Sequence, residues 1–485
     1  MLGDVLMCNY IYRMRSLDAL LDGYHELENQ EIYFASNDEL NDPMEGFRDI
    51  FWHGDEIVWK NFLTHYLLCL EHVFSIVLVG GTSIDKSLLN IPVFKGEEDL
   101  NTDDYKESFY SMRKAFFSHD LVSKLPKLLA GRNSPIRKKE MVFYLRLIHP
   151  LALDSIQSVL LSEGFIKEKV SLPTSFGFGG LGAEKFFDLV NKFNSEVLES
   201  KDSLSETVFD LSCNTLMQMQ LILEYNHRNE EHNYAKLFIV IKFPEEYLSK
   251  IEEMVYPNWY TACFMGDCTN SSSWGKYGYN HTGVCLKFKT KEVNGLNTIS
   301  LTGVIGCGSN GDIIGNRDYT FEKVNYEDEF VEIDFFKSLG RLSFNKLYSQ
   351  WYENENNELS SCADWVNDTP IDDWRKQYWE NFIKCVTTKT KDWQYENEHR
   401  LIINDFFHDY SKKESRKIKY NFDDLEGIIF GIKTPNSDKV KIMEIIEKKC
   451  RVSGRKNFNF YQAEYCRKSG QIQPVKLNLL EFENI

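Results

Sequence analysis

Two glutamates and an arginine occupy every second position of the segment "WQYENEHRLII" (393–403), immediately before the chain turns apolar. In a β-strand, side chains alternate between two faces, so Glu396, Glu398 and Arg400 would share one face. The Cα atoms of the two glutamates would lie roughly 6.5–7 Å apart. Carboxylates held that close repel each other unless a cation or a hydrogen-bond donor lies between them. The segment predicts either a functional acidic pair or a half-exposed edge strand, in which Glu398 pairs with Arg400 and Glu396 is solvated.

The chain opens with a predicted strand–helix–strand–loop unit. Its parts are the strand-like "NYIYRMRS" (9–16), the helix "LDALLDGYHELE" capped by Ser16, the β-rich "EIYFAS" (31–36) and the polar loop "NDELNDPMEG" (37–46). Strand-like runs return from residue 259, as in "WYTACFM", "GVCLKF" and "LEGIIFGI". Segments rich in β-structure are therefore predicted near both ends of the chain.

Long amphipathic stretches dominate the middle of the chain, from about 56 to 255, and predict a helical block. The 485 residues suffice for two or three domains. We expect an α+β protein in which a mixed β core is split by a large helical insertion. The expected division is 1–55 for the first part of the core, 56–255 for the insertion, 256–450 for the second part of the core and 451–485 for a C-terminal extension.

The composition is that of a soluble globular protein, with 42% hydrophobic and 27% charged residues. A net charge of −17 argues against uniform attraction to a nucleic acid backbone, because phosphate contacts need clustered Lys and Arg. Two short basic segments, 131–146 and 412–420, are best explained as solvated charged faces. Eleven cysteines follow no repeating CxxC pattern and Asp4 interrupts any signal peptide, so we expect reduced thiols and a cytoplasmic location.

The most apolar run of the chain is "FLTHYLLCLEHVFSIVLVGG" (62–81), and it contains His65, Glu71 and His72. A membrane-spanning helix would place these polar groups in hydrocarbon at a cost of several kcal/mol. We therefore expect no membrane contact. The run instead predicts a buried helix followed by the strand-like "VFSIVLVGG".

Five motifs occur along the chain in an order that resembles a known family. They are "YRMRSLDALL", "IYFASNDELNDPMEG", "WGKYGYNHTGVCLKF", "DWQYENEHRLII" and "LEGIIFGIK". Their order is similar to that of the bacterial domain-of-unknown-function family twenty-nine seventy-one, over roughly residues 9–52 and 259–449. The helical block lies outside this resemblance, and the family implies no particular chemistry.

A second, weaker resemblance is to the ADP-ribosyltransferases. The chain has an arginine in its first predicted strand, a serine after the second, and Glu-x-Glu entering a later apolar strand. This resemblance implies an ADP-ribosyltransferase-like fold in which Arg15 orients NAD and Ser36 shapes the nicotinamide pocket. It also implies that Glu398 bonds the ribose 2′-hydroxyl and that Glu396 assists the acceptor.

Three aromatic side chains, Tyr33, Phe34 and Trp274, are candidates for stacking on a ring of the bound NAD. Trp274 and Tyr277 are three residues apart, so on one helical turn they would share a face. That spacing fits a position in the hydrophobic core better than a stacking platform.

Three polar residues are further candidates for contacting NAD. Asn41 and Asp42 form a compact polar loop with Glu45. Asp42 and Glu45 could face the same cleft as Glu398, or the loop residues could serve the turn, because Asn and Asp bond their own backbone. His281 could contact a nucleotide or act as a base. A hydrogen-bonded histidine at a loop–strand junction is the favoured interpretation of His281.

These residues predict an NAD-consuming enzyme of the ADP-ribosyltransferase type, which modifies a macromolecule (protein or nucleic acid) or hydrolyses NAD. Breaking the nicotinamide–ribose bond passes through an oxocarbenium-like state. A fixed carboxylate beside the ribose would stabilise that state. By analogy, we expect a bacterial toxin or phage-defence effector whose helical block binds a regulatory partner, and no metal ion.

Two other classes of function stay open. The first is a non-catalytic ligand-sensing or protein-interaction module, which needs no shared cleft. The second is a metal-dependent nuclease, in which magnesium would be held by four carboxylates: Asp42, Glu45, Glu396 and Glu398. Such a nuclease usually has a nearby lysine, which 393–403 lacks. The transferase requires Arg15 and Glu398 to face one cleft, whereas the nuclease requires at least three carboxylates around one ion.

Overall fold

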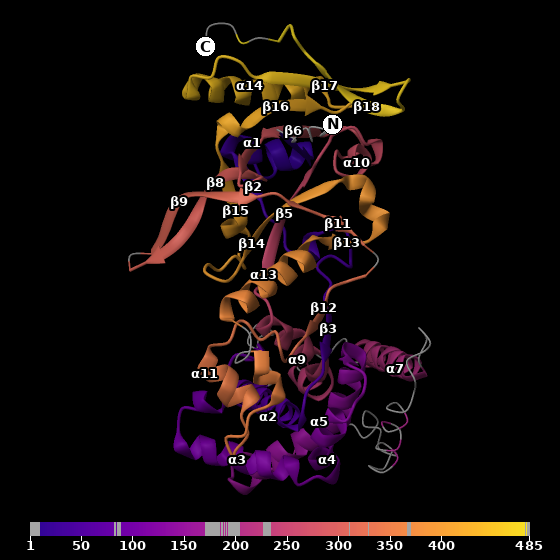
Figure 1. The fold of residues 1–485 in the computed structure, drawn as a ribbon, viewed down its shortest axis with the longest axis vertical. Coiled ribbons are helices and arrows are strands. Elements are labelled where there is room, and N and C mark those ends of the chain that lie inside the picture. Colours follow the sequence, from indigo (N-terminus) through magenta and orange to yellow (C-terminus); the bar gives the residue numbers. More distant parts are fainter. Residues whose placement is uncertain are drawn as a thin grey trace. The chain divides into compact units, whose positions relative to one another are not determined.

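The chain forms two compact units, each described here by itself (Figure 1). The computed structural model describes residues 10–81, 84, 89–169, 185, 188, 190, 192, 204–226, 234–309, 311–327, 329–365, 370–480 and 482. Unit 1 comprises Met1–Phe47, Pro257–Val331 and Asn381–Ile485, and unit 2 comprises Arg48–Tyr256 and Glu332–Glu380. The protein is α+β, as expected from the sequence, with several separate sheets.

Unit 1 contains an eight-stranded sheet. In spatial order its strands are β10 (Glu322–Lys323), β14 (Glu398–Asn404), β5 (Trp259–Met265), β1 (Tyr10–Arg15), β6 (Val284–Lys289), β16 (Leu425–Phe430), β17 (Asn459–Cys466) and β18 (Gln471–Lys476). Neighbouring strands are antiparallel except β16 and β17, which are parallel and connected through helix α14 (Asn436–Ser453). The two strands that carry the main site candidates, β1 and β14, therefore lie on either side of β5.

Strand alternation explains how β14 presents charged groups on one side and apolar groups on the other. Leu401 and Ile403 are buried in the main hydrophobic core of unit 1, together with Phe264 of β5. Glu398 and Arg400 point to the opposite face of the strand, because successive side chains alternate. Burial of the apolar face of β14 thus holds the strand in place, and with it the charged side chains on the other face.

A second sheet of unit 1 has the order β2 (Glu31–Tyr33), β15 (Lys417–Tyr420), β8 (Leu296–Gly308) and β7 (Lys291–Val293), and β9 (Gly311–Thr320) also pairs with β8. A short parallel pair consists of β11 (Asn325–Tyr326) and β13 (Thr388–Lys389). Besides the last part of α13 (Ile371–Thr387), the other described helices of unit 1 are short: η1 (Asp18–Asp22), α1 (Glu26–Asn29), η2 (Asn37–Glu39), α10 (Ser271–Lys276), η11 (Lys391–Glu396), η12 (Lys413–Arg416) and η13 (Phe422–Asp424).

The helix predicted after the first strand is interrupted. Ser16 helps to start it, because its Oγ accepts a hydrogen bond from the Ala19 N–H at 3.2 Å. The π-helical turn η1 then ends at Gly23, and α1 begins at Glu26. His25, between them, has a left-handed backbone (φ 52°), which no continuous helix can contain.

Unit 2 is largely helical. Its helices are α2 (Glu56–Gly80), η5 (Glu97–Asp99), α3 (Asp103–Phe117), α4 (Asp120–Ala130), α5 (Lys138–Ser162), α7 (Leu204–Asn226), α8 (Tyr234–Leu237), η7 (Phe238–Lys242), α9 (Phe243–Ile251), η8 (Glu252–Met254), α11 (Phe344–Leu347), η9 (Tyr348–Tyr352), η10 (Ser361–Ala363) and the first part of α13 (Ile371–Thr387). A small sheet has the order β12 (Glu332–Asp334), β3 (Asp49–Trp52) and β4 (Ile136–Arg137). Most of the predicted helical block therefore lies in unit 2, together with 332–380.

Helix α2 contains the most apolar run of the sequence. It is the one described helix that is long and apolar enough to cross a membrane, and 61% of its most apolar window is buried inside the protein. His65 lies buried within it, where its ring nitrogens contact the Tyr247 hydroxyl and the Val93 carbonyl, each at 2.8 Å. The run is a largely buried helix, as expected. The strand predicted at its end is wrong, because the helix continues to Gly80.

Candidate functional site

The strand predicted over 393–403 begins only at Glu398. Residues Lys391–Glu396 form the 3-10 helix η11, and Asn397 has a left-handed backbone (φ 44°) that joins the helix to β14. Asparagine tolerates this conformation better than most residues. The prediction of one continuous strand is therefore wrong, and Glu396 comes close to Glu398 through a turn rather than through strand alternation.

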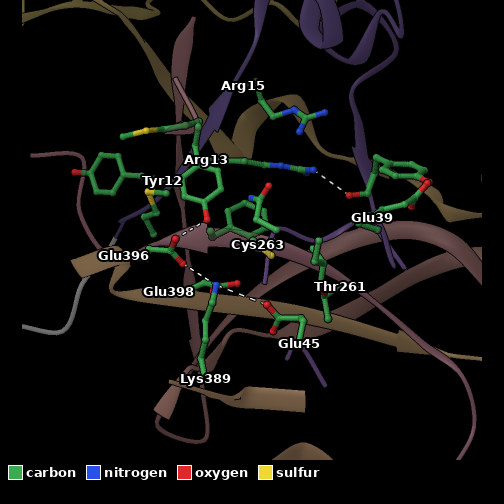
Figure 2. A pocket seen from close by; sticks show the side chains of 18 residues that line it. Tyr12, Arg13, Arg15, Glu39, Glu45, Thr261, Cys263, Lys389, Glu396 and Glu398 are labelled. Carbon is green, nitrogen blue, oxygen red and sulfur yellow. Dashed lines mark hydrogen bonds and ion pairs between the residues drawn. The ribbon is translucent and has the colours of Figure 1, made fainter. Parts of the chain in front are cut away.

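Lys389 provides the cation that the two close carboxylates require. Its Nζ lies 2.8 Å from Glu396 Oε2, 3.1 Å from Glu398 Oε2 and 3.6 Å from Glu45 Oε2. The Lys389 side chain is only 4% exposed, so these ion pairs are shielded from water. Figure 2 shows the ammonium group among the three acids.

Arg400 binds the same carboxylates from the other side. Its Nε and Nη2 donate to the two oxygens of Glu398 at 2.9 and 3.1 Å, and the guanidinium also contacts Glu45 and the Val386 carbonyl. Arg400 is 1% exposed and β14 lies between β10 and β5, so this pair is not on a half-exposed edge strand. Glu396 is also buried rather than solvated. The expected Glu398–Arg400 pair is present, but in the interior.

The charge state of Glu398 follows from these partners. Burial by itself raises the pKa of Glu398, but Arg400 and Lys389 outweigh it and lower the pKa from 4.5 to about 2. Burial raises the pKa of Glu45, and its two cationic neighbours oppose that rise. The pKa values of Lys389 and Arg400 are raised by the acids around them, against the effect of burial. Glu398 is therefore ionised at any physiological pH.

Tyr277 holds the second carboxylate in place. Its hydroxyl donates to Glu396 Oε1 at 2.5 Å, while Oε2 of the same carboxylate accepts from Lys389. Burial and the charge of Glu396 raise the pKa of Tyr277, so the phenol stays protonated and can donate. Tyr277 follows helix α10 directly and, unlike its neighbour Trp274, points toward the charged cluster.

The charged cluster forms part of the wall of a cavity of about 200 Å³ (Figure 2). The lining residues come from β1, β2, β5, β13, β14, η11, the residue directly after α10 and the segment between β2 and β3: Tyr12, Arg13, Met14, Arg15, Tyr33, Ala35, Glu39, Leu40, Asn41, Glu45, Thr261, Cys263, Phe264, Met265, Tyr277, Lys389, Glu396 and Glu398. In Figure 2 the arginines of β1 lie on one side of the cavity and Lys389 on the other. All of these residues belong to unit 1.

Two arginines of β1 give the cavity a positive side. Arg15 is held by Glu26, to which its Nε donates at 2.7 Å with a second, parallel contact from Nη2. Arg13 is 5% exposed and donates to the Tyr33 carbonyl at 2.9 Å. Burial and the charge of Arg15 lower the pKa of Arg13 to about 10, which leaves it cationic at neutral pH.

One buried hydroxyl in the cavity wall has no partner. Thr261 is 1% exposed, and its Oγ1 makes no hydrogen bond within the protein. A buried hydroxyl without a partner costs free energy. Such a group at a cavity surface is available to bond a ligand.

Five of the nine main residues predicted for the site line the cavity: Arg15, Tyr33, Asn41, Glu396 and Glu398. Arg15 and Glu398 therefore meet the requirement of facing one cavity. Asn41 lies beside Glu39, whose carboxylate accepts a 2.8 Å hydrogen bond from the Tyr33 hydroxyl.

The other four predicted residues do not line this cavity, and three of them have another role in the structure. Ser36 caps the short helix η2 together with Glu39. Asp42 serves the turn, because its Oδ1 accepts from the Met44 N–H at 2.9 Å. Trp274 is fully buried in a core cluster and donates to the Cys268 carbonyl at 2.8 Å. His281 has a left-handed backbone (φ 68°), and its ring Nδ1 has no hydrogen-bond partner, in contrast to the hydrogen-bonded histidine expected there.

Several site residues were missed by sequence reasoning. Lys389 lies four residues before the segment 393–403, in which a nuclease lysine was expected. Arg13 shares a strand face with Arg15 by simple alternation, which is a readable signal. Thr261 and Cys263 carry no such signal, because their position depends on β5 pairing with β14 across more than a hundred intervening residues.

The acidic cluster does not have the arrangement of a metal site. Protein cations already lie between its carboxylates, as the contacts of Lys389 and Arg400 show. Within the described ranges, the one group of three or more potential ligands close enough to share an ion is Cys307, Asp312 and His408, which does not line this cavity. The requirement of a carboxylate-based nuclease is therefore not met by the described residues.

The fold and site define an α+β protein with a buried ion-pair network beside a small polar cavity. Residues 273–401 match a family described as "Protein of unknown function (DUF2971)". This match confirms the first family resemblance over the segment that contains Tyr277, Lys389, Glu396 and Glu398. No curated protein and no solved structure matches the chain.

Proposed function

We propose that unit 1 is an NAD-consuming enzyme that breaks the nicotinamide–ribose bond and transfers ADP-ribose to a macromolecule or to water. The observation that carries this proposal is that Arg15 of β1 and Glu398 of β14 line one cavity from opposite sides of β5. This is the arrangement that the resemblance to ADP-ribosyltransferases requires of its NAD-orienting and ribose-binding residues.

The charge distribution suits the chemistry. When the glycosidic bond breaks, its electron pair leaves with nicotinamide and positive charge develops on the ribose. Three buried carboxylates face two cations in the cluster, so this wall of the cavity has an excess of negative charge. Glu398 is ionised and held by Arg400 and Lys389, so it needs little reorganisation to stabilise the transition state.

The outcome of the reaction depends on the acceptor. With water, NAD⁺ and H₂O yield ADP-ribose, nicotinamide and one proton. With a macromolecular nucleophile, the same carbon forms a bond to the acceptor, and the acceptor's proton is lost instead. Lys389 donates to both Glu396 and Glu398 and so holds the two carboxylates close together. This position suits a role for Glu396 in orienting the acceptor.

The size of the cavity limits what it encloses. A volume of about 200 Å³ is below the range of roughly 300–1,000 Å³ for sites that enclose whole drug-sized ligands. We place only the nicotinamide–ribose end of NAD in the cavity. The pyrophosphate then lies toward the arginines of β1, which can bond phosphate oxygens in pairs.

A ligand-sensing module is the second candidate, and one observation favours it. Glu396 and Glu398 are fully engaged by Lys389, Arg400 and Tyr277, so the acids can act as a structural support for a binding pocket without doing chemistry. The cytoplasmic location rests on the scattered cysteines and the N-terminal segment, whereas the toxin or phage-defence setting and a regulatory partner for the helical unit rest on analogy.

The test is nicotinamide release from NAD by the purified full chain, with and without cell lysate as a source of acceptor or trigger. Glu398→Gln keeps the shape of the side chain and should lower the rate by about a hundredfold or more. Glu464→Gln, at an exposed position of β17 in the same sheet, is the matched control and should behave as wild type.

Each outcome separates the candidates. Release by wild type and by the control, but not by Glu398→Gln, supports the transferase. Saturable NAD binding without release, with and without lysate, favours the sensing module. If the protein neither releases nicotinamide nor binds NAD, with and without lysate, the proposal is overturned.

A further inference from the structure

A cysteine, an aspartate and a histidine meet at the end of the β8–β9 hairpin of unit 1. The potential ligand atoms of Cys307, Asp312 and His408 all lie within 4.8 Å of one another. No other described group of His, Cys, Asp and Glu side chains is this compact. None of the three lines the cavity described above, so this cluster is independent of the proposed NAD chemistry.

A β-bulge sets the first two residues opposite each other. Val304 pairs with Ile314, but the next pair is Gly306 with Ile313, so the register shifts by one residue at Ile305. After this shift Cys307 is the direct cross-strand partner of Asp312. Directly paired residues of an antiparallel ladder project from the same face, with Cβ atoms about 4.5–5.5 Å apart. Without the bulge, Cys307 would face the glycine at 311 instead.

The third residue comes from the segment that follows β14. Two hydrogen bonds shape this segment: Phe406 N–H donates to Asn404 Oδ1 at 3.1 Å, and Tyr410 N–H donates to Asp405 Oδ1 at 2.9 Å. The His408 ring packs edge-on against the Tyr410 ring, with centroids 4.7 Å apart. The histidine is therefore supported from behind, with its Nδ1 facing the hairpin.

The two distances from Asp312 to the other ligand atoms are close to those around a tetrahedral ion, and all three ligand atoms lie within 4.8 Å of one another. Asp312 Oδ1 lies 3.5 Å from Cys307 Sγ and 3.7 Å from His408 Nδ1. Zinc bonds of about 2.3 Å to sulfur and about 2.0–2.2 Å to nitrogen or oxygen, at tetrahedral angles, separate ligand atoms by roughly 3.3–3.7 Å. An ion can therefore enter with only small side-chain movements.

We propose that Cys307, Asp312 and His408 form a Zn²⁺ site whose fourth position is open to water. Thiolate and imidazole together select zinc over magnesium or calcium, which prefer oxygen ligands. Cys307 and Asp312 are exposed, so the ion can enter from solvent. Bound zinc would link the tip of the hairpin to the segment following β14, two parts of unit 1 that are far apart in sequence.

The experiment uses the full chain, stripped of metal and kept reduced with a phosphine. Zinc binding is measured by competition with a chromophoric chelator, and cobalt is added separately to detect a thiolate-to-metal charge-transfer band. We expect one equivalent of either metal to bind. Cys307→Ser and His408→Gln should each weaken zinc binding by about a hundredfold or more, above the range for losing a supporting partner of a metal ligand.

The test includes a matched control and a third variant of the proposed site. Cys466→Ser removes a partly exposed thiol on β17, away from the hairpin, and should bind zinc as wild type does. Asp312→Asn tests the exposed carboxylate if either first variant changes the circular dichroism spectrum. The proposal is overturned if wild type binds no zinc, or if Cys307→Ser and His408→Gln keep the wild-type affinity for zinc. It is also overturned if the charge-transfer band of bound cobalt disappears in Cys466→Ser but not in Cys307→Ser.

Discussion

Arg400 and Glu398 bind each other from neighbouring same-face positions of β14, through two hydrogen bonds of 2.9 and 3.1 Å. A bidentate pair so close in sequence fixes both side chains on one strand. Lys389 and Glu45 then join the pair from separate segments. The ion-pair network thus ties the segment before β3 and strand β13 to the central sheet of unit 1.

Replacing Lys389 by methionine should destabilise unit 1 by about 3–5 kcal/mol, because three buried carboxylates would lose a shared cation. Chemical denaturation followed by tryptophan fluorescence measures this change. Lys468→Met, at an exposed position after β17, is the control and should change stability by less than about 0.5 kcal/mol. A loss below about 1 kcal/mol in Lys389→Met would mean that the network is not the buried unit described here.

The stability of unit 1 should fall in acid between pH 4.5 and about 2. Glu398 has a folded-state pKa of about 2 against an ordinary 4.5, so its contribution is fully present above 4.5 and lost as the pH falls toward 2. The difference corresponds to about 3 kcal/mol. Glu45 acts in the opposite direction, since its raised pKa means that stability is regained as it protonates.

Glu398→Gln isolates this contribution. The variant should be less stable at neutral pH and should show a shallower loss of stability between pH 4.5 and 2. Unfolding midpoints in denaturant, measured at intervals across this window, give both slopes. Equal slopes for wild type and variant would assign the acid sensitivity to other carboxyl groups.

Thr261→Val should leave stability unchanged or raise it by about 1–3 kcal/mol, because the wild-type hydroxyl is buried without a partner. Thr298 is the matched control, since it is equally buried but its Oγ1 donates to the Lys291 carbonyl at 3.0 Å. Thr298→Val should therefore lower stability by about 1 kcal/mol. Under the proposed function, Thr261→Val should also weaken NAD binding, which isothermal titration can measure.

Tyr277→Phe should lower stability by about 1.5–3 kcal/mol, the range for a hydrogen bond to a charged group. It should also lower the rate of nicotinamide release more than it changes the affinity for NAD, because Tyr277 positions Glu396. Tyr279→Phe, two residues on at a side chain that is 67% exposed, should change neither quantity. A loss of affinity alone would place the Tyr277 hydroxyl in contact with NAD instead.

Local patterns predicted the parts of the site that lie within one strand. Alternation correctly placed Glu398 and Arg400 on one face, because both residues fall inside β14. The same rule failed for Glu396, where the left-handed Asn397 replaces strand geometry by a turn. Period-two patterns carry no information on where a strand begins, so this boundary could not be read from the sequence.

Residues that contact Glu396 and Glu398 or lie beside them could not all be predicted from the sequence, for a different reason. Lys389 reaches Glu396 and Glu398 because η11 folds back between them. Thr261 enters the site through the pairing of β5 with distant strands, which depends on the topology of the whole unit. Glu45 comes from the polar loop that was expected to face the cleft of Glu398, and it lines the cavity with that residue. Trp274 and Tyr277 were expected together in the core, and the structure buries Trp274 in a core cluster against which Tyr277 packs. The hydroxyl of Tyr277 nevertheless reaches the cavity, which the spacing did not predict.

The order in which β1 and its partners are synthesised has a consequence for folding. The earliest partner strand of β1 in the main sheet is β5, where Met265 pairs with Tyr12 about 250 residues later in the chain. At translation rates of roughly 5–20 residues per second, β1 waits on the order of 13–50 s for this partner. During that interval the backbone amides and carbonyls of β1 lack their native hydrogen-bond partners in the main sheet. The nascent chain is therefore exposed to mispairing long before Lys389 and Arg400 exist to complete the charge network.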